Sequence, residues 1–222
     1  DVGDFAAAGS STFRLASDLG GHSIGFSAGS FGYARGLLLG SQSFERTTLS
    51  YGGELQRYDG PWSDVDEDVN KKNFSAKLTH ELAWGKLRAS VMAYDNRWRS
   101  PDQIPERAVQ SGLINELGSL DTDLGGESSR YSASLGFNAD VGGGIFDIST
   151  YVVDYDFSLF SNFTYFLDDP VNGDEFEQFD ERQMFGGALS QSWFADDWNM
   201  RVGADARTDL IDRVGLSRTA AR

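Results

Sequence analysis

Apolar and polar residues alternate with a period of two along most of this chain. From Tyr131 to Asp140 the odd positions are apolar or aromatic, and the even positions are Ser, Gly, Asn or Asp. The same alternation recurs over 74–82 and 198–207. Because successive side chains of a strand point to opposite sides, this period predicts strands with one apolar and one polar face.

The alternation predicts a chain built almost entirely of long strands. Strands of five or six residues are usual in soluble sheets, and most of these are about twice as long. Tight links, such as Ala83–Lys86 and Val141–Gly144, alternate with long connections from about residue 41 onward. Outer-membrane barrels alternate in this way because their periplasmic turns are short and their extracellular loops are long. The predicted fold class is therefore all-β, an antiparallel transmembrane β-barrel. The predicted strands are 22–30, 31–41, 46–58, 72–83, 86–98, 128–140, 144–159, 179–194 and 197–208, with a tenth beginning near Val214.

The alternation fails at two places. Three consecutive leucines in 31–41 leave the faces of that strand undecided. We expect its Arg35 on the polar, inward face, since an arginine facing lipid costs roughly 2–4 kcal/mol. Within 144–159 the apolar residues change phase after Val152. A bulge near Thr150 would account for the change, and so would a strand that leaves the membrane and continues in another solvent.

Composition narrows the classes of function. The chain has no cysteine, which excludes disulfides and thiolate zinc sites. Its net charge of −15 argues against a nucleic-acid partner. The segments 59–71, 99–127 and 160–178 together carry −13 of this charge, so charge is concentrated in the predicted long loops. No run of about 18 apolar residues predicts a membrane-spanning helix. The mean hydropathy of −0.38 does not exclude a barrel, because half of the residues in barrel strands are polar.

Six segments occur in this order along the chain: DFAAAGSSTFRLASDLGG, IGFSAGSFGYAR, YDGPW, DQIPERAV, GGESSRYSASLGF and LFSNFTYFLDDPVNGDEFEQFDER. Together they resemble TonB-dependent receptors of Gram-negative outer membranes, over essentially the whole chain. In that family a plug domain precedes a 22-stranded barrel. The resemblance implies that 1–18 is the C-terminal tail of the plug and that 19–222 is the N-terminal portion of the barrel, with about nine to ten of its strands.

The resemblance also implies a location and partners. The chain would lie in the cell outer membrane, in contact with outer-membrane lipid, and would bind a small-molecule nutrient. The TonB energy-transducing complex would act through the N-terminal plug region, which is absent from this sequence together with the remaining strands. We therefore expect the chain to be a piece of a receptor.

Catalytic chemistry is poorly supported. His22 and His80 fall on predicted strands without a nucleophile motif, so we interpret them as wall residues. Asp64–Asn70 places oxygen ligands at alternate positions, as a calcium loop does, but it lacks the glycine and the final glutamate of that motif. We expect no enzyme activity, no cofactor and no metal site.

The long loops hold the candidate ligand-binding residues. A short helix is expected within 105–114, with Pro105 at its first position. The aromatic residues of 160–166 could stack on a ligand ring, or they could form an interfacial girdle where the strand leaves the membrane. For Trp84, Trp193 and Trp198, beside the short turns, the girdle is favoured. The ligand-binding candidates are Trp62, Asp64, Asp66, Asp68, Phe163, Tyr165, Asp168 and Asp169.

The resemblance implies TonB-dependent active transport of a scarce nutrient, either a metal chelate such as a siderophore or a carbohydrate. Two alternatives stay open. A passive porin-type barrel would have no plug-like segment before its first strand. A soluble all-β module, such as a carbohydrate-binding sandwich, would bury its apolar positions against a second sheet.

Overall fold

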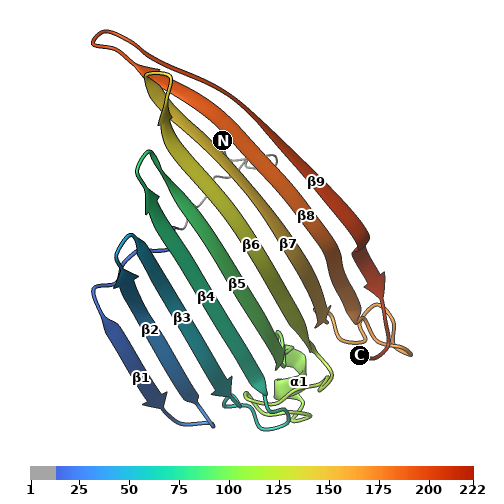
Figure 1. Ribbon diagram of the computed structural model, residues 1–222. Helices are drawn as coiled ribbons and strands as arrows, with labels where there is room; N and C mark the ends of the chain where they lie inside the picture. The colour runs from blue at the N-terminus through green and yellow to red at the C-terminus, as the bar shows by residue number, and fades with distance from the viewer. Residues whose placement is uncertain (1–13) are drawn as a thin grey trace.

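The computed structural model describes residues 14–222, which form one antiparallel sheet of nine strands (Figure 1). Each strand pairs with the next in sequence, so the sheet order is β1 to β9 without a crossover. The all-β prediction is confirmed at this level. The predicted plug tail lies mostly at 1–13, outside the described residues. The strands are β1 (His22–Ala28), β2 (Ala34–Phe44), β3 (Thr47–Tyr58), β4 (Val69–Leu82), β5 (Gly85–Arg99), β6 (Gly125–Val141), β7 (Gly144–Ser161), β8 (Phe176–Phe194) and β9 (Asn199–Arg218).

The connections alternate in length as predicted. Two to four residues join β2 to β3, β4 to β5, β6 to β7 and β8 to β9 at one end of the sheet. The longer connections lie at the other end, where α1 (Glu106–Gln110) is placed (Figure 1). This helix is shorter than the predicted 105–114, and Pro105 precedes it in extended geometry.

The strand register aligns the alternation across the sheet. Residues paired on neighbouring antiparallel strands share a face. The pairs Leu78–Ala89, Ala89–Leu135 and Leu135–Thr150 therefore form one row of side chains that crosses four strands on the same face. We call this side the apolar face and the opposite side, which carries Ser90 and Ser134, the polar face. Large side chains of the apolar face are exposed, among them Leu135 at 55% and Val202 at 59%. The apolar face carries Leu49, Leu55, Phe74, Leu78, Leu87, Val91, Tyr131, Leu135, Phe137, Ile148, Val152, Phe185, Leu189 and Val202.

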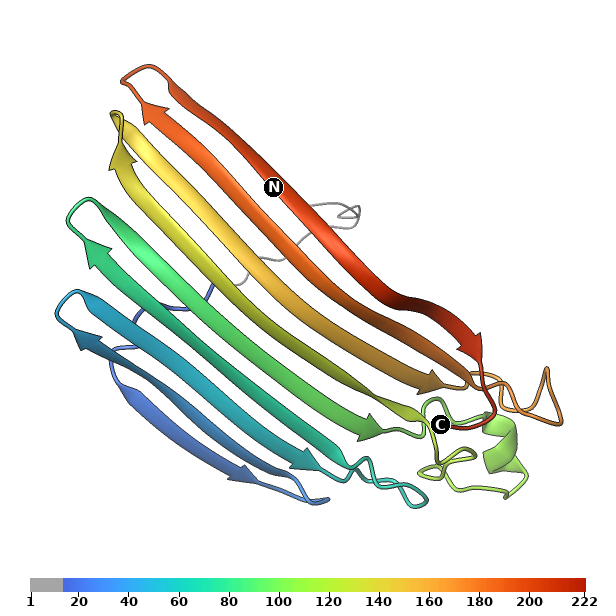
Figure 2. The ribbon, with the colours of Figure 1, turned by 45° about the vertical axis from the view of Figure 1, so that its right-hand side comes forward.

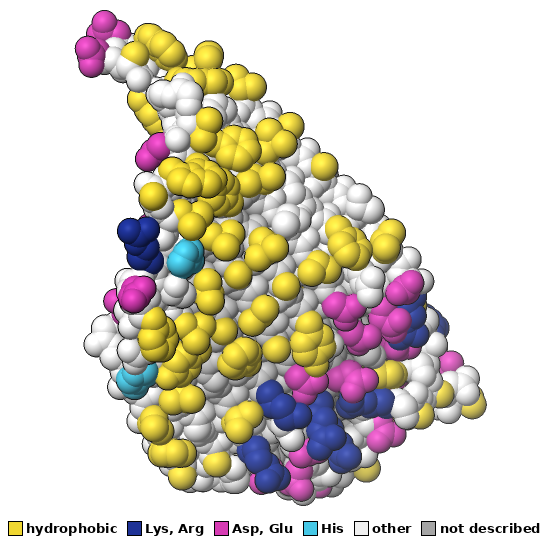
Figure 3. All heavy atoms as spheres, viewed as in Figure 1, with side chains coloured by type: hydrophobic (Ala, Val, Ile, Leu, Met, Phe, Trp, Pro, Cys, Tyr) yellow, Lys and Arg dark blue, Asp and Glu magenta, His cyan; other side chains and the backbone are white. Residues whose placement is uncertain are grey.

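The apolar face becomes charged toward the long loops, as the space-filling view shows (Figure 3). Lys72, Asp95, Asp156 and Glu181 lie on this face, one or two rows beyond its last large apolar residues. This border explains the phase change in β7. Beyond Val152 the same face carries Asp154 and Asp156, while Tyr155 and Phe157 lie on the polar face.

Two predictions about strand geometry are wrong. β7 pairs with both neighbours through Thr150 without a register shift, so no bulge lies there. The irregularity lies instead between β8 and β9 at Glu181/Arg182, where Asp212 has no partner in the register. β9 continues past Val214 to Arg218, so the strand predicted to begin there is the end of β9. The extra residue at the bulge shifts the alternation of apolar and polar positions by one residue. In the sequence, this shift resembles the start of a new strand.

The sheet is open and does not close into a barrel. Among residues 14–222, β1 pairs only with β2 and β9 only with β8. The outer edges of β1 and β9 therefore present unpaired backbone groups.

The segment before β1 lies on the polar face. The ammonium group of Lys77 donates to the carbonyl oxygen of Leu15 and the hydroxyl of Ser17, both at 2.8 Å. Ser50, also on this face, donates to the carbonyl oxygen of Ala16 at 2.8 Å. Arg35 lies on the polar face as predicted, where its Nε donates to Glu54 at 2.9 Å.

Candidate functional site: a packed cap of three loops

Three long connections pack together at one end of the sheet, where the second ribbon view shows them gathered around α1 (Figure 2). We call them the loop cap, residues 59–68, 100–124 and 162–175. The cap contains most of the deeply buried side chains of the described chain. Leu124, Pro101 and Asn162 are less than 2% exposed, and Ala108 and Tyr165 are nearly as buried. The loops are therefore packed elements, although their acidic composition predicts solvated ones.

The first contact joins 59–68 to 100–124. The backbone N–H groups of Ser63 and Ser119 donate to the Leu117 carbonyl and to Asp64 Oδ2, each at 2.9 Å. Asn115 Nδ2 also donates to the Ser63 hydroxyl at 3.0 Å. The Asp64 carboxylate is thus held by a protein N–H group, which gives it a structural role in the cap.

The second contact joins 100–124 to 162–175. The buried Tyr165 hydroxyl donates to the Pro101 carbonyl oxygen at 2.7 Å. Arg107, on α1, donates from Nη2 to the carbonyl oxygens of Thr164 and Tyr165 at 2.6 and 2.8 Å. Burial, and then the negative charges of Asp102 and Asp121, raises the pKa of Tyr165. Tyr165 is therefore a neutral packing residue and not an exposed surface for ligand stacking.

Asp174 organises the tip of the 162–175 loop. Desolvation opposes its ionisation, but donors from the Asp168 backbone, the Thr164 hydroxyl and the Asp169 and Leu167 backbones lower the pKa of Asp174 to about 2. These donors lie 2.7–3.1 Å from its oxygens. Asp169 closes the following turn by accepting from Val171 and Asn172, both at 3.0 Å. Both carboxylates serve the loop backbone.

Glu175 is a buried acid of the cap that is not among the ligand-binding candidates. It is 3% exposed, and its Oε1 has no hydrogen-bond partner among the described residues. Burial raises the pKa of Glu175 to about 7, with further contributions from the charge and the carboxyl contact of Asp121 and from the charge of Asp123. Only the tertiary fold brings this carboxyl group against acids from 100–124.

The remaining ligand-binding candidates differ in how accessible they are. Asp66, Asp168 and Phe163 are exposed, and the Phe163 ring meets Phe176 edge-on at 5.1 Å. Trp62 is half-buried, and its Nε1 donates to Glu67 at 2.6 Å. Asp68 is also half-buried and lies 3.6 Å from Arg97. The structure thus leaves Asp66, Asp168 and Phe163 as the candidates most open to an external ligand.

The girdle interpretation fits one set of aromatic residues and not the other. Trp84 lies in the β4–β5 turn, 58% exposed, with its ring 5.3 Å from Phe137 of the apolar face. Trp193 belongs to the same face at the turn end of β8. The aromatic residues of 160–166, in contrast, lie beyond the charged rows at the loop end. Charged rows therefore separate the aromatic residues of 160–166 from the large side chains of the apolar face.

No constellation typical of catalysis or metal binding is found in the described part of the chain. His22 Nδ1 lies 3.0 Å from the Tyr51 hydroxyl, and His80 Nδ1 lies 2.7 Å from the Thr47 hydroxyl. Each histidine thus contacts a side chain of another strand on the apolar face. Within 14–222 no three His, Cys, Asp or Glu side chains are grouped to hold a metal ion. None of the helices described there is long and apolar enough to cross a membrane.

Comparison with protein-family models, with curated proteins and with solved structures found no match for this chain.

Proposed function

We propose that this chain forms part of the wall and the external loops of an outer-membrane β-barrel that takes up a scarce nutrient in a TonB-dependent manner. The observation that carries the proposal is the apolar face, which is exposed and ends on a charged border toward the long loops. On β5 the change occurs between Ala93 and Asp95, and on β7 it occurs one row earlier, between Val152 and Asp154. A wall in contact with hydrocarbon requires such a band, and a soluble surface does not.

The height of the apolar face supports this assignment. On β6 its positions run from Tyr131 to Val141. At a rise of about 3.4 Å per residue, this stretch extends about 34 Å along the strand. A strand tilted by about 45° would then cross about 24 Å, close to the apolar band of about 25 Å in outer-membrane barrels.

The aromatic residues at the two borders of the face support it further. Phe74 and Tyr131 lie on its last rows before the charged border, and Trp84, Phe137 and Phe146 lie toward the short turns. Amphipathic and aromatic side chains concentrate at the two interfaces of a membrane barrel. The two ends of the face therefore resemble two membrane interfaces.

The polar face supports the interior side of a plugged barrel. The segment 14–21 crosses β2, β3 and β4 there through Ser41, Ser50 and Lys77. A segment packed on the inner wall favours a receptor with an internal plug over an empty porin. A soluble sandwich is disfavoured because no second layer among residues 14–222 covers the apolar face, whose exposed area far exceeds the patches usual on monomers.

The proposal requires further strands. An unpaired strand edge exposes backbone N–H and C=O groups, and each would cost several kcal/mol in hydrocarbon. Partners for the outer edges of β1 and β9 must therefore come from the rest of the polypeptide or from another chain. The exposed cap residues Asp66, Asp168 and Phe163 would then face the external medium, where a nutrient arrives.

The absence of cysteine allows a direct test by single-cysteine labelling in intact membranes. We expect cysteines at Ala133 and Leu135 to react with a lipid-soluble maleimide and to be protected from a charged one. Cysteines at Ser132 and Ser134 should show the opposite preference. Equal reactivity of the two sets with the charged reagent in membrane-embedded protein, or recovery of the protein outside the membrane fraction, would contradict the proposal.

Transport is tested separately from membrane insertion. Uptake of radiolabelled siderophore and oligosaccharide panels should cease when the inner-membrane energy complex is deleted, whereas a passive porin would retain it. Phe163→Ala and Asp168→Asn should weaken binding of the transported compound, with Gln103→Ala, at another exposed position of the cap, as the control. Uptake unchanged by loss of the energy complex would favour the porin.

A further inference from the structure

We infer that the apolar face carries a specific site for an anionic lipid, over β1 to β5 at the charged border. The inference rests on the proposed membrane location and goes beyond it. General contact with lipid needs only an apolar surface, whereas a selective site needs a shaped hollow and a charged group placed for the headgroup. Both are present at this position.

The hollow results from small residues set among large ones. Gly36 and Gly53 lie on the apolar face between the side chains of Phe26, Leu55 and Phe74. The groove that they form holds about 700 Å³ and is lined almost entirely by apolar surface. Missing side chains on neighbouring strands therefore leave a trough in which an acyl chain can lie against backbone.

Cations gather at the loop end of this groove. Lys72 lines the groove directly, and Arg57 and Arg97 lie one row farther toward the loops on β3 and β5. Arg57 is exposed and makes no ion pair with any residue of 14–222. Lys72 and Arg97 form only exposed pairs, at 3.5 Å to Asp95 and 3.6 Å to Asp68. Exposed pairs of this kind contribute little, so these cations are available to a phosphate.

The charge on this border is divided between two halves of the sheet. Over β6 to β8 the same border carries Glu127, Asp156 and Glu181. The space-filling view shows dark blue side chains together with magenta ones on one part of this edge, and mainly magenta ones on the other part (Figure 3). An anionic headgroup would therefore be attracted over β3 to β5 and repelled over β6 to β8. The cations over β3 to β5 therefore favour a lipid with an anionic headgroup as the occupant of the groove.

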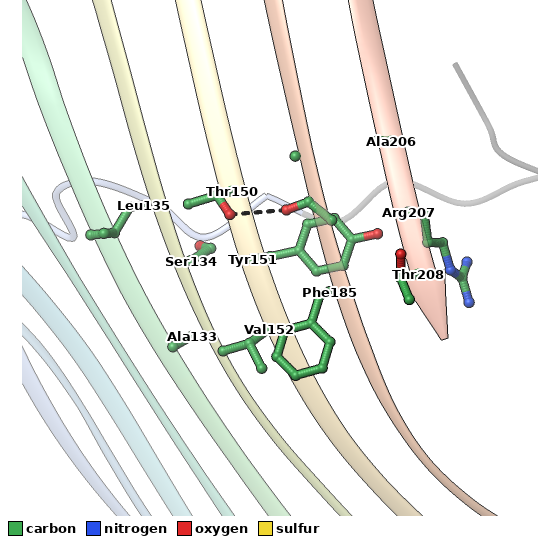
Figure 4. Close-up of a pocket in the computed structure, with 12 residues that line it drawn as sticks. Ala133, Ser134, Leu135, Thr150, Tyr151, Val152, Phe185, Ala206, Arg207 and Thr208 are labelled. Carbon is green, nitrogen blue, oxygen red and sulfur yellow. Dashed lines mark hydrogen bonds between the residues drawn. The ribbon is translucent and has the colours of Figure 1, made fainter. Parts of the chain in front are cut away.

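A second hollow on the apolar face provides an internal comparison. Leu135, Thr150, Val152 and Phe185 surround it, with Ala206 on β9 (Figure 4). Its volume is about 480 Å³, and on the apolar face its nearest charged border is the acidic half over β6 to β8. An acyl chain could occupy this hollow, but the cation that lines it, Arg207, belongs to the polar face and donates to the Asp209 carboxylate at 2.7 Å. The two hollows should therefore differ in headgroup selectivity.

The test uses the full-length protein, purified from membranes in a neutral detergent and offered equimolar phosphatidylglycerol and phosphatidylcholine. Native mass spectrometry counts the bound lipids. We expect preferential retention of phosphatidylglycerol, with roughly fivefold weaker retention for each cation removed in Arg57→Gln and Lys72→Gln. Gly53→Leu should also displace the lipid by filling the groove. Its backbone is not left-handed, and a Cβ there would meet only the Asn73 carbonyl oxygen at 3.8 Å, so the substitution fits without strain.

Two matched controls isolate the site. Lys86→Gln removes a cation from the polar face, and Ala206→Leu fills the second hollow, so neither should change the phosphatidylglycerol preference. Equal retention of both lipids, unchanged binding in Gly53→Leu, or displacement by millimolar inorganic phosphate would each overturn the inference. Heat-modifiable migration of the same samples tests the barrel independently. If the wild-type protein shows heat-modifiable migration but no lipid preference, this lipid site alone is rejected. If the wild-type protein shows no heat-modifiable migration, the membrane assignment is rejected as well.

Discussion

The hydroxyl of Tyr165 donates to the carbonyl oxygen of Pro101 at 2.7 Å, joining two loops that are 64 residues apart in sequence. Both residues are almost completely buried. This bond ties the tip of the β7–β8 connection to the start of the β5–β6 connection. The loops of the cap are thereby held in a fixed arrangement, and exposed residues such as Phe163 project from a packed base.

Replacing Tyr165 by Phe should loosen the cap without unfolding the sheet. The substitution removes one hydrogen bond and leaves the buried Pro101 carbonyl without a donor, which together cost about 1–3 kcal/mol. Backbone amides of 162–175 should then exchange roughly 5- to 150-fold faster, since local opening follows the local free energy. Hydrogen exchange measured by mass spectrometry checks this, with peptides from β6 as the internal reference. Unchanged exchange in 162–175 would show that the bond does not stabilise the cap.

Arg107 should act as the second link between the same two loops. Its guanidinium group serves two carbonyl oxygens, so Arg107→Ala should release the 162–175 loop from α1. Hydrogen bonds from a charged donor contribute about 1.5–3 kcal/mol each. Limited proteolysis should therefore cut 162–175 faster in Arg107→Ala than in Gln103→Ala, an exposed substitution in the same loop. Equal cutting of the two variants would contradict a role for Arg107 in holding the loop.

The cap should weaken as the pH rises through the neutral range. The pKa of Glu175 is raised to about 7, chiefly by burial and then by Asp121. The folded cap therefore binds this proton more tightly than the unfolded chain does. The stability that the bound proton of Glu175 gives to the cap is fully present below the ordinary pKa of a glutamate, and it is lost as the pH rises to about 7. Hydrogen exchange of 162–175, corrected for intrinsic rates, should show less protection at pH 8 than at pH 5.

Glu175→Gln provides the control for this pH dependence. The amide is neutral at every pH, so the cap of the variant should keep at pH 8 the protection that the wild type has at pH 5. The expected gain at pH 8 is on the order of 2 kcal/mol. Asp66→Asn, which removes an exposed carboxylate of the cap, should leave the pH profile unchanged. If Glu175→Gln keeps the wild-type pH profile of hydrogen-exchange protection, a group other than Glu175 causes the pH dependence.

The strands could be predicted because each follows one rule over many residues. In β6 the alternation of Tyr131–Asp140 fixes both the strand and its faces, since one side meets a different environment from the other. The rule fails where the environment changes along a face, as it does beyond Val152 in β7. It also fails in β2, where only Leu38 of three consecutive leucines lies on the apolar face, opposite Ile24.

The loop cap could not be predicted in the same way. The sequence marked 59–71, 99–127 and 160–178 as acidic connections, and it identified the segments that hold the candidate residues. It carried no sign that Asp64 binds the Ser119 backbone or that Tyr165 reaches Pro101. Such contacts join positions more than 50 residues apart and follow no period. Exposure, which separates Phe163 from Tyr165, is decided only when the three loops pack together.

Two neighbouring positions on β6 should respond in opposite ways to the same substitution. Leu135 lies on the apolar face and Ser134 on the polar face, at nearly the same depth. In lipid, an arginine at mid-depth costs roughly 2–4 kcal/mol on the outer face of a barrel, and a polar interior accommodates it. Leu135→Arg should therefore sharply reduce the folded, heat-modifiable form in membranes, while Ser134→Arg should leave it near the wild-type amount. If both variants assemble equally well and remain in the membrane fraction, the apolar face does not contact hydrocarbon.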